Sequence, residues 1–122
     1  MELSERLEMV AGLVTQERIA DIGTDHGYVP IYLYKKGRIK KAYACDVRKG
    51  PLEKCKKNIA LYGAEDVIET RLGSGLTPLK AGEAETAIMA GMGGMLIVHI
   101  LQDSPEVAAS LTELVLSPQR DF

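Results

Sequence analysis

The sequence contains no apolar run near the roughly 18 residues that a membrane-spanning helix requires, so we expect no membrane partner. Cysteine is also scarce. The two cysteines, Cys45 and Cys55, form no CxxC pair, and we interpret them as reduced thiols of a cytoplasmic protein. Residues 1–6 are polar and acidic, which is not the pattern of a secretory signal peptide. We also expect no metal site.

Positive charge is concentrated in one segment, although the net charge of the 122 residues is only −2. Ten of the fifteen lysines and arginines fall between residues 35 and 57. A cluster of this kind binds phosphates by releasing their counterions, but it is also typical of a solvated, lysine-rich helix. Charge alone leaves both interpretations open. The ten residues are Lys35, Lys36, Arg38, Lys40, Lys41, Arg48, Lys49, Lys54, Lys56 and Lys57.

Short apolar segments alternate along the chain with segments of helical periodicity, within a length that allows one domain. The pattern predicts an α/β fold in which a mostly parallel sheet carries helices on both faces. Because both faces are covered, we expect wholly apolar strands. The predicted strands cover residues 19–22, 42–46, 67–72, 86–90 and 114–116. The predicted helices cover residues 3–14, 30–36, 51–63 and 95–102, followed by a short helix that Ser104 caps and Pro105 opens.

The fifth predicted strand, residues 114–116, would lie at an edge of the sheet, and Pro118 would end it. Its apolar side chains would leave that edge uncovered. We therefore expect a fold that is truncated after the fifth strand, and a natural polypeptide that continues beyond residue 122.

Three glycine-containing loops follow predicted strands, at residues 23–27, 73–75 and 91–94. The carboxyl ends of parallel strands lie together at one edge of the sheet, where ligands of open α/β sheets bind. Glycine lets the backbone approach a ligand closely and adopt a positive φ. One such glycine indicates only a turn, whereas three loops at one edge predict a ligand-binding crevice.

The first loop, residues 23–27, departs from the dinucleotide pattern G-x-G-x-x-G because it lacks the middle glycine. Asp21 and Asp25 would repel a pyrophosphate, so an NAD-dependent oxidoreductase is the less favoured alternative. A cofactor with positive charge fits better, and S-adenosylmethionine carries both a sulfonium and an ammonium group. Asp46, at the end of the second predicted strand, would accept hydrogen bonds from the ribose hydroxyls, worth about 1.5–3 kcal/mol each.

Because of these residues, the chain resembles the bacterial tRNA (adenine-22-N1)-methyltransferase family, a group of class I S-adenosylmethionine-dependent enzymes. The resemblance covers residues 3–119 and implies a Rossmann-like catalytic domain. It implies that residues 1–122 are the N-terminal part of the S-adenosylmethionine-binding domain, without the helical C-terminal domain of the family. The matching segments are Leu3-Ser4-Glu5-Arg6-Leu7, Ala20-Asp21-Ile22-Gly23-Thr24-Asp25-His26-Gly27-Tyr28-Val29-Pro30, Gly73-Ser74-Gly75-Leu76 and Ala90-Gly91-Met92-Gly93-Gly94.

The resemblance implies methyl transfer from S-adenosylmethionine to N1 of adenine 22 in tRNA. A fragment that binds the cofactor but has no activity is the alternative. Adenine N1 already has a lone pair, so the enzyme has to orient the base and the methyl group rather than remove a proton. Because N1 is hidden in a paired base, we expect the base to turn out into a pocket.

The loop at residues 91–94 would form a wall of this pocket with its backbone. The product is a cationic N1-methyladenine, and we assign its stabilisation to Asp25. His26 would either bond the adenine or brace its loop, and Ser74 or the backbone would bind the cofactor adenine. Tyr28 could stack on a base, but packing in the core is the favoured interpretation. The catalytic candidates are Asp25, His26, Gly91 and Met92. The cofactor-binding candidates are Asp21, Gly23, Thr24, Gly27, Asp46, Val47, Gly73, Ser74, Gly75 and Gly91.

Overall fold

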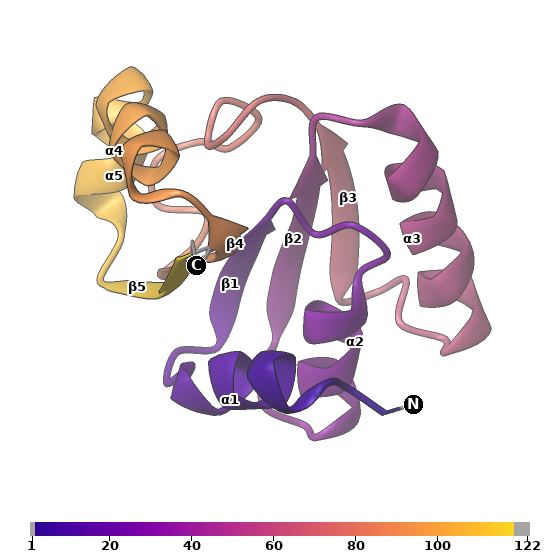
Figure 1. Ribbon diagram of the computed structural model, residues 1–122. Helices are drawn as coiled ribbons and strands as arrows, with labels where there is room; N and C mark the ends of the chain where they lie inside the picture. The colour runs from indigo at the N-terminus through magenta and orange to yellow at the C-terminus, as the bar shows by residue number, and fades with distance from the viewer. Residues whose placement is uncertain (1, 119–122) are drawn as a thin grey trace.

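The structure of the protein, a computed structural model, describes residues 2–118. Five parallel strands form one sheet in the order β3-β2-β1-β4-β5 (Figure 1), which confirms the predicted α/β fold. The strands are β1 (Arg18–Ile22), β2 (Lys41–Asp46), β3 (Ile68–Leu72), β4 (Thr86–Met92) and β5 (Glu113–Pro118). The helices are α1 (Glu5–Leu13), α2 (Tyr28–Lys35), α3 (Lys49–Leu61), α4 (Gly94–Asp103) and α5 (Pro105–Ser110).

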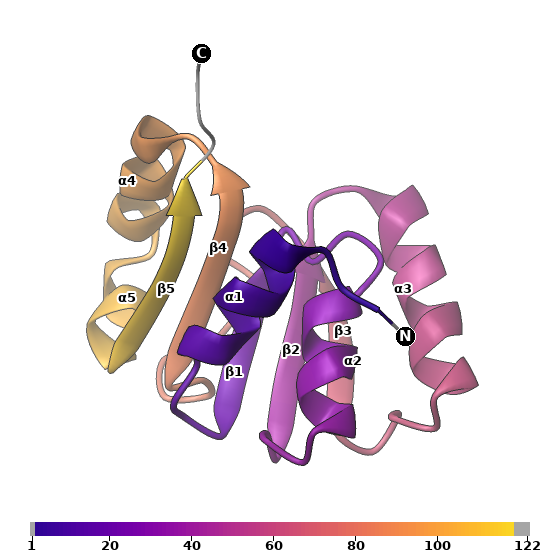
Figure 2. The same cartoon turned by 60° about the horizontal axis from the view of Figure 1, so that its bottom comes forward.

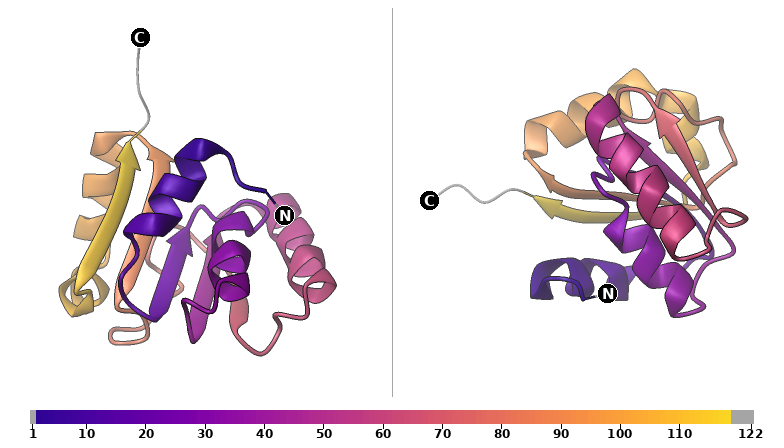
Figure 3. Two further views of the ribbon diagram at one scale, coloured as in Figure 1. Left: turned by 90° about the horizontal axis from the view of Figure 1, so that it is seen from below. Right: turned by 90° about the vertical axis from the view of Figure 1, so that its right-hand side faces the viewer.

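Helices cover both faces of the sheet (Figure 2; Figure 3). Helices α1, α2 and α3 lie on one face, and α4 and α5 lie on the other. Successive strand residues alternate between the two faces. Ile19 and Ile88 therefore belong to the core under α1–α3, whereas Ala20 and Met89 belong to the core under α4. No helix within residues 2–118 is long and apolar enough to cross a membrane.

The chain changes direction across the sheet at β1. Helix α2 follows β1 and covers one face, whereas α4 follows β4, the neighbour of β1, and covers the opposite face. The loops at the carboxyl ends of β1 and β4 consequently diverge. This is the topological switch point at which open parallel sheets bind ligands.

Strand β3 departs from the expectation that every strand is wholly apolar. It lies at the edge of the sheet and carries Glu69 and Arg71, which form an ion pair of 2.8 Å between Oε2 and Nε. The prediction was wrong for β3 because an edge strand is only partly covered. Charged side chains on such an edge also oppose pairing with another chain.

Four local predictions also differ from the structure. Helices α2 and α3 begin at Tyr28 and Lys49, each two residues before the proline expected to open it. Strand β4 continues past Ala90 to Met92, with a shift in its pairing register to β5 between these two residues. Ser104 precedes α5 without a capping hydrogen bond from its side chain, so that prediction was wrong. The extension of β4 matters most because it places Met92 at the end of a strand rather than in a loop.

Gly27 is required by the packing between α2 and α3. Its φ is +79°, and a Cβ at this position would lie 2.5 Å from the Sγ of Cys55 on α3. Burial raises the pKa of the Cys55 thiol to about 12, so the sulfur is a neutral packing group. A glycine here therefore allows α3 to approach the loop that follows β1.

We expect Gly27→Ala to lower the free energy of unfolding by about 2–4 kcal/mol, because it combines a left-handed backbone with steric overlap. Gly37→Ala is the matched control. Gly37 has a similar φ of +67°, but apart from its chain neighbours no heavy atom of residues 2–118 lies within 4 Å of the point where a Cβ would stand, so its loss should be only about 1–2 kcal/mol. Urea denaturation measures both values, and equal losses would refute the packing role.

Candidate functional site

The loop after β1 is attached to the end of β2 by three hydrogen bonds. The backbone N–H groups of Gly23 and Thr24 both donate to the carbonyl oxygen of Cys45, at 2.9 and 2.8 Å. The N–H of Asp25 donates to Oδ2 of Asp46 at 2.9 Å. Asp25 has a φ of +57°, a left-handed conformation that aspartate tolerates better than most residues. The loop therefore turns around the end of β2.

Asp46 is a buried carboxylate that is satisfied as an anion. Its side chain accepts hydrogen bonds from the N–H of Asp25 and, at Oδ1, from the N–H of Arg48 at 2.9 Å. Burial by itself would raise the pKa of Asp46, but these N–H donors and the Arg48 guanidinium outweigh it and hold the pKa below its usual value. Oδ2 accepts only the Asp25 bond within residues 2–118, so it retains capacity for another donor.

Asp21, at the end of β1, is in a different electrostatic position. It is only 5% exposed and accepts one side-chain hydrogen bond, from Oγ1 of Thr24 at 2.9 Å. Burial raises the pKa of Asp21 to about 7; the Thr24 bond lowers it, and the negative charge of Asp46 raises it further. Within residues 2–118 it forms no ion pair. A buried acid without a counterion beside a cavity is suited to receive a cationic ligand group.

Two cavities of about 330 and 210 Å³ lie side by side at this edge of the sheet. They share Gly23, Arg48 and Met92, and Cε of Met92 lies 3.1 Å from the position of a Cβ on Gly23. The larger cavity is lined by Arg6, Leu7, Asp21, Gly23, Thr24, Asp25, Tyr28, Val29, Arg48, Ala90, Gly91 and Met92. The smaller is lined by Ile22, Gly23, Cys45, Asp46, Val47, Arg48, Gly73, Ser74, Gly75, Met92, Leu96 and Ile100.

Most of the predicted site residues line this crevice. The larger cavity contains Asp21, Gly23, Thr24, Asp25, Gly91 and Met92, and the smaller contains Gly23, Asp46, Val47, Gly73, Ser74, Gly75 and Met92. The three glycine loops therefore meet at one place, although they are far apart in the sequence. The crevice is divided in two at the Met92 side chain.

Two predicted residues, His26 and Gly27, line neither cavity. The carbonyl of His26 accepts a hydrogen bond from Nδ2 of Asn58 on α3, at 2.9 Å. Its ring stands edge-on to the ring of Tyr28, with 5.6 Å between the centroids, and its Nε2 lies 3.7 Å from Oδ1 of Asp25. These contacts tie the backbone of His26 to α3 and its ring to Tyr28 and Asp25.

Several cavity residues were not among the predicted site residues, although Arg6, Leu7 and Tyr28 lie in segments that match the family. Arg6 and Leu7 enter the larger cavity from α1, a helix that follows neither a glycine loop nor a strand. Tyr28 was expected in the core, but it is 42% exposed and lines the cavity, so that expectation was wrong. Leu96 and Ile100 reach the smaller cavity from α4. Their spacing of four residues indicates one helix face, but not what that face contacts.

The loop that carries Gly73 is braced by an ion pair below the crevice. Arg71 donates to both carboxylate oxygens of Glu83, at 2.6 and 2.7 Å, and to the carbonyl of Pro78 at 3.0 Å. The hydrogen bonds from Arg71 lower the pKa of Glu83 to about 2. This clamp holds the long segment between β3 and β4 against the sheet. No group of three potential metal ligands is found within residues 2–118.

Fold and site together define a class I methyltransferase domain: a parallel sheet, a buried acid at the end of β2, and glycine loops at the switch point. A family model described as a methyltransferase domain matches residues 3–122, and the chain belongs to this family. Among curated proteins, it is similar to the tRNA (adenine(22)-N(1))-methyltransferase of Bacillus subtilis. The two are 36% identical over 119 residues, which are 97% of this chain and 50% of that protein.

Solved structures of related proteins have the same fold. A Streptococcus pneumoniae protein crystallised with S-adenosyl-L-methionine superimposes with a TM-score of 0.91 at 38% identity, covering 96% of this chain and 56% of that one. TrmK of M. capricolum, in complex with S-adenosyl-homocysteine, has a TM-score of 0.78 at 38% identity, covering 84% and 47%. The chain thus spans about half the length of the relatives it matches.

The raised pKa of Asp21 predicts a pH dependence of stability. Because the folded protein binds the proton of Asp21 more tightly than the unfolded chain does, stability is lost as the pH rises from about 4 through about 7. Asp21→Asn, which cannot ionise, should lack this loss and be more stable than the unsubstituted protein by about 2–4 kcal/mol at pH 8. The measurement is urea denaturation at several pH values. Parallel pH curves for the two proteins would contradict the assignment.

Proposed function

We propose that this chain is the cofactor-binding part of a tRNA (adenine-22-N1)-methyltransferase that uses S-adenosylmethionine. The observation that carries the proposal is the pairing of two different acids across one divided crevice. Among residues 2–118, Asp46 is ionised and has a free acceptor, whereas Asp21 is buried without a counterion. A ligand with a ribose at one end and positive charge at the other satisfies both. The relatives crystallised with S-adenosyl-L-methionine and S-adenosyl-homocysteine support it.

The residues of the crevice fit this cofactor. Asp46 would accept hydrogen bonds from the ribose hydroxyls. The smaller cavity would take the adenine, since Val47, Leu96 and Ile100 offer apolar contacts and the backbone at residues 73–75 offers polar ones. The sulfonium and ammonium groups would then lie in the larger cavity, near Asp21. When bound, S-adenosylmethionine supplies an electrophilic methyl group.

The larger cavity can also orient the acceptor base. Gly91 lines it without a side chain, so a flat ring can approach its backbone. Methylation of adenine N1 leaves a positive charge on the ring, and no proton has to be removed first. The carboxylate of Asp25 lines the same cavity and is half-exposed, so it would stabilise that charge electrostatically. The Arg48 guanidinium, 3.5 Å from Oδ1 of Asp25, holds this carboxylate in place.

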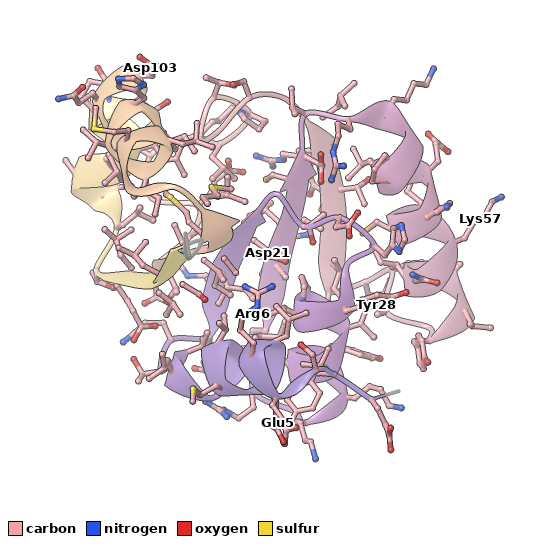
Figure 4. The ribbon with its side chains drawn as sticks, in the orientation of Figure 1. Glu5, Arg6, Asp21, Tyr28, Lys57 and Asp103 are labelled. Carbon is pink, nitrogen blue, oxygen red and sulfur yellow. The ribbon has the colours of Figure 1, made fainter. Side chains whose placement is uncertain are left out.

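Binding of tRNA would involve the basic surface of α3. Lys54, Lys56 and Lys57 are exposed on this helix, and Lys57 extends away from the body of the protein in Figure 4. Exposed lysines contact phosphates and release their counterions. A tRNA substrate would place the reaction in the cytoplasm. We further infer that a helical domain outside residues 1–122 shares in tRNA recognition, as the family resemblance implies.

Calorimetry with S-adenosylmethionine and with NAD tests the cofactor. We expect binding of S-adenosylmethionine only, and Asp46→Ala should weaken it about 100-fold or more, because two hydrogen bonds to a charged acceptor are lost. Asp66→Ala is the control, since Asp66 is exposed and lines neither cavity. Binding of NAD alone, or near-normal affinity in Asp46→Ala, would overturn the assignment.

Salt-dependent binding of unmodified tRNA tests the basic surface. The triple substitution of Lys54, Lys56 and Lys57 by Gln should weaken binding and reduce the slope of log affinity against log salt by about 2–3. Lys80→Gln, which lies in the segment between β3 and β4, should leave the slope unchanged. An unchanged slope in the triple variant would mean that these lysines form only a solvated surface.

A further inference from the structure

Arg6 enters the larger cavity and takes no part in the contacts proposed above for the cofactor. In Figure 4 its side chain extends from α1 toward the end of β1 that carries Asp21. Its two terminal nitrogens lie 3.7 and 4.0 Å from the position of a Cβ on Gly91, so the guanidinium rests beside the backbone at the end of β4. A positive charge on a solvent-exposed side chain therefore lines the crevice.

The position of Arg6 is set by the packing of α1. Val10 and Ala11 on this helix are buried in the core, and Ser4 caps it by accepting a hydrogen bond from the N–H of Leu7. Arg6 lies one helical turn before Val10 and so projects from nearly the same face of the helix. The anchored helix thus directs this guanidinium toward the end of β4, where it lines the larger cavity although the residue remains exposed to solvent.

The charge of Arg6 is not neutralised by the surrounding acids. No carboxylate within residues 2–118 lies within 4.0 Å of its guanidinium. The other acids of the crevice have partners: Asp25 and Asp46 both contact Arg48. Asp21 accepts only from the hydroxyl of Thr24. The larger cavity therefore offers one cation and one acid that are both without a counterion among the described residues.

An α-amino acid carries the complementary pair of charges on a single carbon atom. We propose that Arg6 binds the α-carboxylate at the methionine end of the cofactor, while Asp21 receives the ammonium group. The proposal rests on the proposed function, because it needs a methyl donor that carries an amino-acid end. The planar guanidinium suits a carboxylate because it can donate two parallel hydrogen bonds.

A phosphate of the bound RNA is the competing ligand for Arg6. The location of the guanidinium argues against it, since Asp21 and Asp25 line the same cavity and would repel a phosphate. A zwitterion has no net charge, so it can place its carboxylate at Arg6 and its ammonium at the acids. Arg6 would then select donors that carry an intact amino acid.

The test compares two ligands that differ only in the amino-acid end. S-adenosyl-homocysteine has it, whereas 5′-methylthioadenosine has a methyl group in its place. By calorimetry, Arg6→Met should weaken S-adenosyl-homocysteine binding about 10- to 100-fold and leave 5′-methylthioadenosine binding within about twofold. Arg6→Lys, which keeps the charge without the planar fork, should recover part of the loss. Lys40→Met, which removes one exposed positive charge outside both cavities, should change neither affinity.

Three other results of these binding measurements would each lead to a different conclusion. Equal weakening of both ligands by Arg6→Met would mean that the residue only supports the shape of the crevice, and would overturn the proposal. Unchanged binding of both ligands with reduced tRNA affinity would assign Arg6 to an RNA phosphate and overturn it as well. If the unsubstituted protein bound neither ligand, the proposed function itself would fail.

Discussion

The attachment of the β1 loop to the end of β2 is the constraint on which the site depends. Three N–H groups of this loop donate to β2, two to the carbonyl of Cys45 and one to the carboxylate of Asp46. Asp46 therefore serves two purposes, because the carboxylate that holds the loop also lines the smaller cavity. Loss of its charge would loosen the loop and remove the ribose acceptor at the same time.

Three acids lie close together at this edge of the sheet, and each is compensated differently. Asp46 is satisfied by backbone N–H donors together with Arg48, and Asp25 by the same arginine from the solvent side. In the described part of the chain Asp21 has only the Thr24 hydroxyl, and its burial raises its pKa to about 7. The crevice consequently has an unmet demand for positive charge at a single point. This asymmetry makes the site suited to a cationic methyl donor and poorly suited to a pyrophosphate.

Residues predicted for the site line the crevice where they lie at a strand end, and less consistently elsewhere. Asp21, Asp46 and the glycine loops line the crevice because parallel strands necessarily end at one edge. His26 and Gly27 belong to the same loop, but they face α3, where Asn58 and Cys55 contact them. Neighbours along a loop turn in different directions, and the pattern of residue types does not encode those directions.

The order of the elements, the parallel sheet and the edge at which ligands bind were determined by the sequence itself. Periodicity, glycine positions and short connections are local properties, so they can be recognised residue by residue. Only the tertiary structure decided how the crevice is divided at Met92, which acid is left without a cation among residues 2–118, and that Arg6 shares a cavity with that acid. These features depend on how α1 and α4 pack across the sheet, and therefore on contacts between segments that are distant in sequence.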